Sequence, residues 1–338
     1  MRSLAFYAFV LIPGTSLCGQ DRPSIPPAVR SGMQTITAAD IKRRIDVIAH
    51  DSMGGRDTPS RGLDLTAEYI ASEFARFGLR PAGDNGKFIQ RYPLPGGPAT
   101  RTAPNVAGIL EGSDPALKRE YIVVSAHMDH VGIGAPVNGD SIYNGADDDA
   151  SGTVGVIELA EALSRPDARP KRSVVFLTVS GEEHGLWGSA WFSDHSPVPI
   201  TDIVANLNID MIGRNWKDTI VVIGKEHSDL GATVDRVAQA HKELDMRPID
   251  DIWPEENFYF RSDHYNFARK GVPVLFFFNG THPDYHGPDD EPGRIDAEKE
   301  ARIVRLVYLV THEVGNADER PKWNPASYRR IVRPAQRD

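Results

Sequence analysis

The sequence predicts an α/β fold in which helices flank a mainly parallel, doubly wound central sheet within a single domain. Two observations carry this prediction. Five short apolar runs, rich in β-branched residues, have the length and composition of strands buried on both faces. Helix-like segments lie between or after them, and alternation of strands and helices is typical of parallel sheets. The runs are YIVVSA (121–126), VVFLTVS (174–180), IVANLNI (203–209), TIVVIG (219–224) and VPVLFFF (272–278), and the helical segments are 151–164, 229–244 and 297–315.

Two helices and a short strand are expected before the first of these runs. Thr37 followed by Asp40 is typical of an N-cap with an acidic first turn, which predicts a helix over about 38–50. Thr66 is the predicted N-cap of a second helix, which Gly78 would end. The Gly- and Pro-rich stretch that follows is expected to form loops around one strand near 88–92.

Length and charge limit the classes of partner. A chain of 338 residues can bury a large core. The net charge is -9 and no basic stripe runs along a helix, which argues against nucleic acid or an anionic membrane as partner. Small molecules or peptides are therefore the expected ligands.

The N-terminus predicts export. Arg2 gives a positive start, Leu4 to Ile12 form an apolar run and Gly14 to Gly19 offer a cleavage zone, so residues 1–19 are expected to be a signal peptide. The apolar run is shorter than the ~20 residues of a membrane-spanning helix. The predicted location is the periplasm or the extracellular space, and residues 20–36 are expected to be a linker or N-terminal arm.

Cys18 is the only cysteine and would leave with the signal peptide. The mature chain would then form no disulfide. Any metal site would use histidine and carboxylate ligands instead of thiolates.

Histidines and carboxylates follow four of the five apolar runs. In an open α/β sheet, loops at the carboxyl ends of the strands line the ligand crevice, so these side chains are expected to converge there. They are His127 and Asp129, then Glu182 and Glu183, then Asp210, and finally His282 and His286.

Three adjacent aspartates, Asp147, Asp148 and Asp149, precede the predicted helix over 151–164. Alone, this cluster suits an acidic surface turn as well as a metal site, because repelling carboxylates need water, backbone N–H groups or cations around them. Together with the other strand ends, it favours two metal ions that share a carboxylate. Oxygen and nitrogen ligands fit zinc, with cobalt or manganese as substitutes.

Six motifs in order resemble one family. They are similar to those of the co-catalytic dizinc exopeptidases of the leucyl aminopeptidase and aminopeptidase Y type, whose relatives include glutamate carboxypeptidase II and glutaminyl cyclase. The resemblance implies a zinc exopeptidase fold, with a catalytic domain over 37–316, no protease-associated domain inserted between Tyr92 and Asn105, and a basic C-terminal extension over 317–338. The motifs are SAHMDH (125–130), NGADDDASG (144–152), SGEEHGLWGS (180–189), NLNIDMIGR (206–214), SDH (262–264) and HPDYHGPDD (282–290).

The resemblance also implies the metal ligands. His127 and Asp210 would bind one zinc ion, Glu183 and His286 the other, and Asp148 would bridge the two. It further implies a non-proline cis peptide after Asp148. Asp147 and Asp149 would be neighbours and not ligands.

Three more residues receive roles. Asp129, two residues after His127 in extended chain, is expected to orient that imidazole. Glu182 is the expected general base, which takes a proton from a water bridging the two metal ions. Tyr259 matches a tyrosine that hydrogen-bonds the developing oxyanion, and fits equally a core or pocket-wall aromatic.

Three histidines near the motifs are expected to lie in the wall of the site without binding metal, namely His130, His264 and His282. The implied function is an exported aminopeptidase that hydrolyses N-terminal residues from peptide or aminoacyl substrates. A carboxypeptidase, a glutaminyl cyclase and a non-enzymatic binding protein on the same fold are the alternatives. Oligomeric state and the preferred N-terminal residue stay open.

Overall fold

The computed structural model describes residues 25–332 of the chain. The predicted signal peptide (1–19) and the end of the C-terminal extension (333–338) lie outside the described residues.

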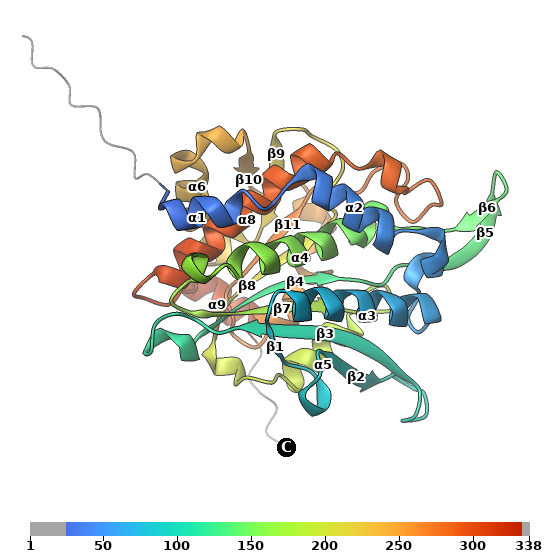
Figure 1. Cartoon of the computed structure of the whole chain (residues 1–338), viewed down its shortest axis with the longest axis horizontal. Coiled ribbons are helices and arrows are strands. Elements are labelled where there is room, and N and C mark those ends of the chain that lie inside the picture. Colours follow the sequence, from blue (N-terminus) through green and yellow to red (C-terminus); the bar gives the residue numbers. More distant parts are fainter. Residues whose placement is uncertain (1–24, 333–338) are drawn as a thin grey trace, which may run out of the picture.

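A nine-stranded sheet forms the centre of the molecule, in the order β1-β3-β7-β4-β8-β11-β9-β10, with β2 also paired to β3. Each of the five predicted runs is one of its strands. A separate hairpin, β5–β6, projects from the body (Figure 1). The strands are β1 (Arg80–Pro81), β2 (Ile89–Pro93), β3 (Thr102–Leu110), β4 (Tyr121–His127), β5 (Ile133–Val137), β6 (Asp140–Ile142), β7 (Ser173–Val179), β8 (Ile203–Asp210), β9 (Thr219–Ile223), β10 (Arg247–Ile249) and β11 (Val274–Phe278).

The central strands β7, β4, β8 and β11 are parallel to one another. Antiparallel pairs flank them, because β3 is antiparallel to β7 and β9 is antiparallel to β11. Parallel strands end at the same edge of a sheet, so the loops after β4, β7, β8 and β11 open side by side. This edge holds the candidate site.

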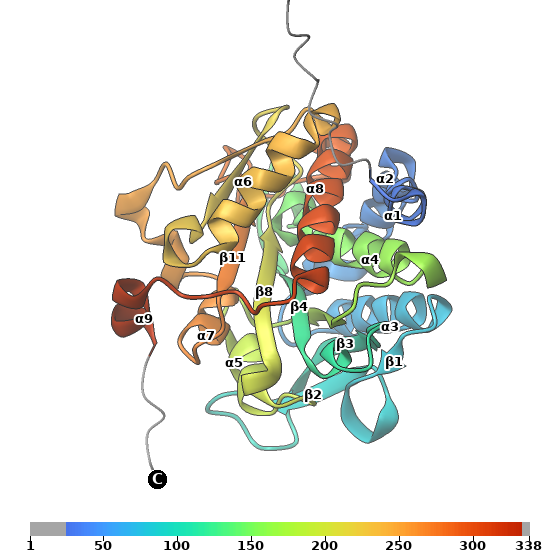
Figure 2. The ribbon, with the colours of Figure 1, turned by 90° about the vertical axis from the view of Figure 1, so that its left-hand side faces the viewer.

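Helices cover both faces of the sheet. Alternate strand residues enter two separate apolar clusters, such as Val124 on one face and Val123 on the other, which explains why the runs are nearly continuous in apolar residues. The helices α4 and α8 lie on one side, and α5 and α7 on the other (Figures 1 and 2). The helices are α1 (Pro27–Met33), α2 (Ala38–Ile48), α3 (Arg61–Arg76), α4 (Gly152–Leu163), α5 (Trp187–Asp194), α6 (Leu230–Ala240), α7 (His264–Ala268), α8 (Ala297–Asn316) and α9 (Pro325–Ile331).

The first predicted helix is confirmed as α2, and its cap is Thr37, whose side chain accepts a hydrogen bond from the Asp40 amide at 3.1 Å. The predicted cap of the second helix is wrong. Thr66 lies inside α3 and donates to the Gly62 carbonyl, while Ser60 accepts from the Leu63 amide at 3.1 Å. The apolar stripe of α3 begins at Leu63 in its first turn and continues through Ala67, Ile70 and Phe74, so the cap lies before the predicted one.

Both flanking segments pack on the domain. Residues 27–33, within the predicted linker or arm, form α1, and the Val29 carbonyl accepts from the Tyr308 hydroxyl at 3.0 Å. In the predicted C-terminal extension, Trp323 donates to the Gly271 carbonyl at 2.9 Å before α9 begins. Among residues 25–332, no helix has both the length and the apolar character that crossing a membrane requires.

Ser60→Ala is expected to lower the free energy of unfolding by about 1 kcal/mol, because it leaves an amide in the first turn of α3 without its cap. Ser72→Ala is the matched control, since Ser72 is exposed within the same helix and bonds only the Tyr69 carbonyl. Urea denaturation measures both variants. Equal stability of Ser60→Ala and the wild type would show that Ser60 is not the cap.

Candidate metal centre

The candidate site lies where the predicted ligands leave the ends of the parallel strands. His127 is the last residue of β4 and Asp210 the last residue of β8. Glu183 follows β7, and His286 lies in the loop after β11. Asp148 comes from the turn that precedes α4.

His127, Asp148 and Asp210 form the first group of potential ligands. Their ligand atoms all lie within 4.8 Å of one another, and all three side chains are buried. Nε2 of His127 is 3.2 Å from Oδ1 of Asp148 and 3.6 Å from Oδ1 of Asp210. This spacing lets one small cation contact all three.

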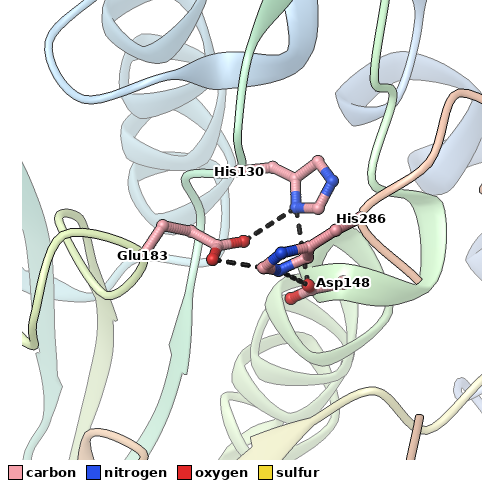
Figure 3. A group of neighbouring side chains, drawn as sticks. All are labelled: His130, Asp148, Glu183 and His286. Atoms are coloured by element: carbon pink, nitrogen blue, oxygen red, sulfur yellow. Dashed lines mark hydrogen bonds and ion pairs between the residues drawn. The ribbon is translucent and has the colours of Figure 1, made fainter. Parts of the chain in front are cut away.

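His130, Asp148, Glu183 and His286 form the second group (Figure 3). Nε2 of His286 lies 3.1 Å from Oδ2 of Asp148 and 3.1 Å from Oε2 of Glu183. Asp148 therefore presents one carboxylate oxygen to each group.

The donor set fits two cations. Carboxylate and imidazole donors suit zinc, and a carboxylate with one oxygen on each side can bridge two ions. The structure thus brings together the five predicted ligands in the predicted two groups, and their role as ligands stays a prediction.

His130 also belongs to the second group, beyond its predicted place in the wall of the site. Its Nδ1 is 2.9 Å from Oε1 of Glu183 and 3.5 Å from Oδ2 of Asp148. The ring packs so tightly on Gly145 that a Cβ there would lie 2.4 Å from it. The sequence signal was its place three residues after His127, which alone does not reveal which way the loop turns.

Charge interactions stabilise this arrangement of side chains. Burial alone would raise the pKa of Asp148, but hydrogen bonds from His127 and His286 hold it well below its usual range. Burial would lower the pKa of His127, yet the carboxylates of Asp210 and Asp129 raise it well above its usual range. Both shifts show a site whose carboxylates favour positive charge between them.

Asp129 contacts both the His127 ring and the turn that carries Glu182. Its carbonyl oxygen lies 3.2 Å from Nδ1 of His127, whereas its carboxylate lies 3.6 Å from that atom. The carboxylate accepts hydrogen bonds from the Gly181 amide at 2.7 Å and from Thr58 Oγ1 at 3.0 Å. Both the carbonyl and the carboxylate of Asp129 lie near this ring nitrogen, so its role in orienting the imidazole stays a prediction. The side chain also fixes the turn that carries Glu182.

The three aspartates have separate partners. Asp149 accepts from the Gly152 amide at 2.8 Å and the Met211 amide at 3.1 Å, and Asp147 accepts from the Gly213 amide at 2.6 Å. Asp148 faces the cavity instead. The peptide bond between Asp148 and Asp149 is cis, as the family resemblance implies.

Arg56 joins the loops that carry the ligands. It is fully buried, and its guanidinium donates to the carbonyls of Met128, Asn144 and Gly145 at 2.6–2.8 Å. Met128 follows the ligand of β4, while the other two carbonyls precede the aspartate cluster. No local sequence pattern indicates this role, because the three carbonyls lie 72, 88 and 89 residues from Arg56 along the chain.

A cavity of about 410 Å³ adjoins the two groups. Glu182 lines it together with four of the predicted ligands. Burial raises the pKa of Glu182 well above its usual range, and the charges of Asp263 and Asp210 add to the shift. A carboxylate with a raised pKa suits proton transfer.

Of the two roles that the sequence allowed for Tyr259, the position of its side chain fits that of a core aromatic. This side chain is 5% exposed and does not line the cavity; its ring packs against His227 at 4.4 Å and His264 at 5.3 Å between centroids. Tyr285 lines the cavity and stacks on His286 at 3.9 Å. Its place directly before the predicted ligand was the signal that could have found it.

His264 and His282 are buried, and neither lines the cavity. His264 is buried and stacks on Phe276, and burial lowers its pKa to about 3. His282 places Nε2 3.3 Å from Oδ2 of Asp147.

Comparison with known proteins now decides the family. The model of peptidase family M28 matches residues 105–311, which include all five predicted strand runs and all five predicted ligands. The chain belongs to peptidase family M28. The family resemblance predicted from the sequence is thereby confirmed.

Curated relatives of this M28 chain carry peptidase names. A probable zinc metalloprotease of Pyrenophora tritici-repentis is 32% identical over 202 residues, 56% of this chain and 40% of that protein. A probable leucine aminopeptidase of Arthroderma otae is 26% identical over 223 residues, 64% of this chain and 58% of that protein. The chain spans about half the length, or less, of the curated relatives it matches.

Solved structures share the fold. The aminopeptidase of Aneurinibacillus sp. strain AM-1 superposes with a TM-score of 0.66 at 14% identity, covering 86% of this chain and 97% of that one. The glutaminyl cyclase of Porphyromonas gingivalis gives 0.64 at 16% identity, covering 82% and 98%. The predicted fold class is confirmed, and the presence of both enzymes shows that the fold alone does not select the reaction.

Asp148→Asn is expected to weaken zinc binding by more than about 10-fold, because it removes the charge that both groups share. Asp147→Asn is the matched control and should retain zinc, since Asp147 bonds the Gly213 amide outside both groups. Mass spectrometry of the metal content after equilibration with zinc measures both. Retention by Asp148→Asn with loss by Asp147→Asn would place the bridge one residue earlier.

Proposed function

We propose that this chain is an exported, zinc-dependent aminopeptidase that hydrolyses N-terminal residues from peptides. The observation that carries the proposal is the pair of ligand groups joined by Asp148, with Glu182 in the same cavity. The family supports the use of zinc and a peptide substrate. Relatives named leucine aminopeptidase support the choice of the N-terminal bond.

The first ion would be held by His127, Asp148 and Asp210, and the second by Asp148, Glu183 and His286. When bound, two zinc ions supply Lewis-acid activation of a water molecule and of the peptide carbonyl. Glu182 accepts the proton of the attacking water and passes it to the leaving amine. Its raised pKa allows it to hold that proton between the two steps.

Tyr285 would donate its hydroxyl to the oxygen that becomes negative during attack. Burial raises the pKa of Tyr285, so the phenol keeps its proton and can donate it in a hydrogen bond. Tyr259 does not serve this role, because it lies outside the cavity lining.

Two alternatives on the same fold lead to different expectations. A glutaminyl cyclase of the type that binds a single zinc would not need the group formed by His127, Asp148 and Asp210, and this group is complete here. A carboxypeptidase would cleave N-acetylated peptides with a free C-terminus, which an aminopeptidase does not accept. A binding protein without activity would not need Glu182 beside intact ligand groups.

Export is proposed from the sequence alone, because its signal lies in residues 1–19, outside the described residues. Cleavage there would place the enzyme in the periplasm or outside the cell.

Glu182→Gln is expected to lower kcat on leucine p-nitroanilide by about 10²- to 10⁴-fold, because glutamine cannot accept the proton. Zinc content should stay at the wild-type value, since Glu182 belongs to neither ligand group. Glu298→Gln, an exposed position on α8, is the control. Full activity of Glu182→Gln would reject its role as base, and a zinc-loaded wild type that cleaves no aminoacyl or peptide amide would reject the function.

Tyr285→Phe is expected to lower kcat by about 10²-fold with little change in zinc content, because it removes one donor to the oxyanion. Tyr259→Phe should leave kcat within about 3-fold of the wild type, since its buried hydroxyl has no hydrogen-bond partner to lose. Steady-state kinetics on the same substrate compares them. A larger loss of kcat for Tyr259→Phe than for Tyr285→Phe would show that Tyr259, and not Tyr285, donates to the oxyanion.

A further inference from the structure

Arg261 is the one lysine or arginine among the described residues that line the cavity. The remaining polar lining includes the carboxylates of Asp148, Glu182 and Asp210, so a guanidinium stands at the edge of an acidic site. The ion-pair partner of Arg261 is Glu256, which belongs to neither ligand group. Its charge therefore is not used in holding the metal ligands.

The observed partners of Arg261 leave it open to a ligand. Its side chain is 54% exposed and lies 4.8 Å from the centre of the Phe258 ring. Within residues 25–332, its hydrogen bonds leave from Nη1, which donates to the carbonyl and the carboxylate of Glu256 at 3.3 Å. Among the described residues, Nη2 and Nε make no hydrogen bond, and a guanidinium offers five donors in a planar fork.

The backbone holds Arg261 beside the metal groups. Its neighbour Ser262 donates to Oδ2 of the predicted ligand Asp210 at 3.0 Å and also lines the cavity. Arg261 is therefore the sequence neighbour of a residue, Ser262, that contacts a predicted metal ligand. A small substrate whose scissile bond lies at the two ligand groups would extend toward it.

The cavity walls suit a short substrate. The aromatic side chains of Phe258, Phe276 and Phe278 form an apolar wall beside the charged groups of the cavity, as is typical of small-molecule sites. An N-terminal ammonium group is attracted to the acidic side, which leaves the other charged end of a short peptide near the guanidinium.

We propose that Arg261 binds a carboxylate of the substrate, so that the cavity selects short peptides carrying that charge. The carboxylate is either the C-terminus of a dipeptide or the side chain of an acidic N-terminal residue. The fork of a guanidinium matches a carboxylate with two parallel hydrogen bonds, which a peptide carbonyl cannot accept in the same way. The inference rests on the proposed aminopeptidase function for the place of the scissile bond.

Binding to the zinc-loaded Glu182→Gln protein tests the proposal without turnover. Isothermal titration calorimetry would use Leu-Gly, Leu-Gly amide, Glu-Gly amide and Gln-Gly amide, which differ in the presence and place of the carboxylate. The substitutions are Arg261→Met, which removes the charge, and Arg261→Lys, which keeps a charge but not the fork. Arg236→Met is the matched control, because Arg236 is a similarly exposed arginine paired with a glutamate far from the cavity lining.

Arg261→Met is expected to raise the Kd of one carboxylate ligand about 10-fold and that of its amide partner less than about 2-fold, the range of a charge-assisted hydrogen bond in a partly exposed site. A loss confined to Leu-Gly identifies the C-terminal carboxylate, and a loss confined to Glu-Gly amide identifies the acidic side chain. Arg261→Lys should recover part of the affinity. Arg236→Met should match the parent protein for all four ligands.

Equal changes for carboxylate and amide ligands, no change for any ligand, or no binding by the parent protein would overturn the proposal. Thermal unfolding of each variant separates a loss of folding from a loss of the contact, because an unfolded variant loses all four ligands together. Turnover of Leu-Gly and of glutamate p-nitroanilide, which each carry one of the two proposed carboxylates, by the protein with Glu182 intact is the separate test of the proposed function. Selective carboxylate binding without such turnover would keep the role of Arg261 and reject the aminopeptidase activity.

Discussion

Repulsion between the carboxylates at one edge of the sheet is the constraint on which the site depends. Buried carboxylates are stable only when donors or cations surround them. The chain meets this need in two ways. Asp129, Asp147 and Asp149 accept hydrogen bonds from backbone amides, whereas Asp148 and Asp210 turn toward imidazoles and the cavity. The first set therefore builds the loops, and the second set is left for cations.

The same hydrogen bonds explain why loops from distant parts of the chain keep a fixed position. Asp149 joins the start of α4 to the end of β8, because its Oδ1 accepts from both the Gly152 and the Met211 amides. Arg56 adds a positive charge behind these loops and donates to carbonyls of both segments that flank the hairpin. A site that must hold ligands at defined distances needs such support, since small displacements of the donors weaken metal binding.

Residues whose position follows from the strand ends were predictable. His127 and Asp210 end two parallel strands, so the sheet alone brings them to one edge. Side chains placed by loops were less predictable. Tyr259 and Tyr285 are both near motif residues, and only the course of the loops shows that the first enters the core and the second lines the cavity. The predicted cap of α3 was wrong for a similar local reason, because Ser60 and Thr66 can both cap a helix and both precede apolar residues at helical spacing.

The sequence by itself determined the five apolar strands, the helices between and after them, the family and the five predicted ligands, because apolar periodicity and motif order are properties of the chain. It did not predict β3, which pairs with β7 in the same sheet. The tertiary structure alone decided which carboxylates accept hydrogen bonds from backbone amides and which remain free to bind cations. Hydrogen bonds such as that from the Gly181 amide to Asp129 join residues far apart in sequence, and no local pattern reveals them. It also placed Arg261 at the cavity and His130 beside Glu183, because the directions of side chains on loops follow from packing.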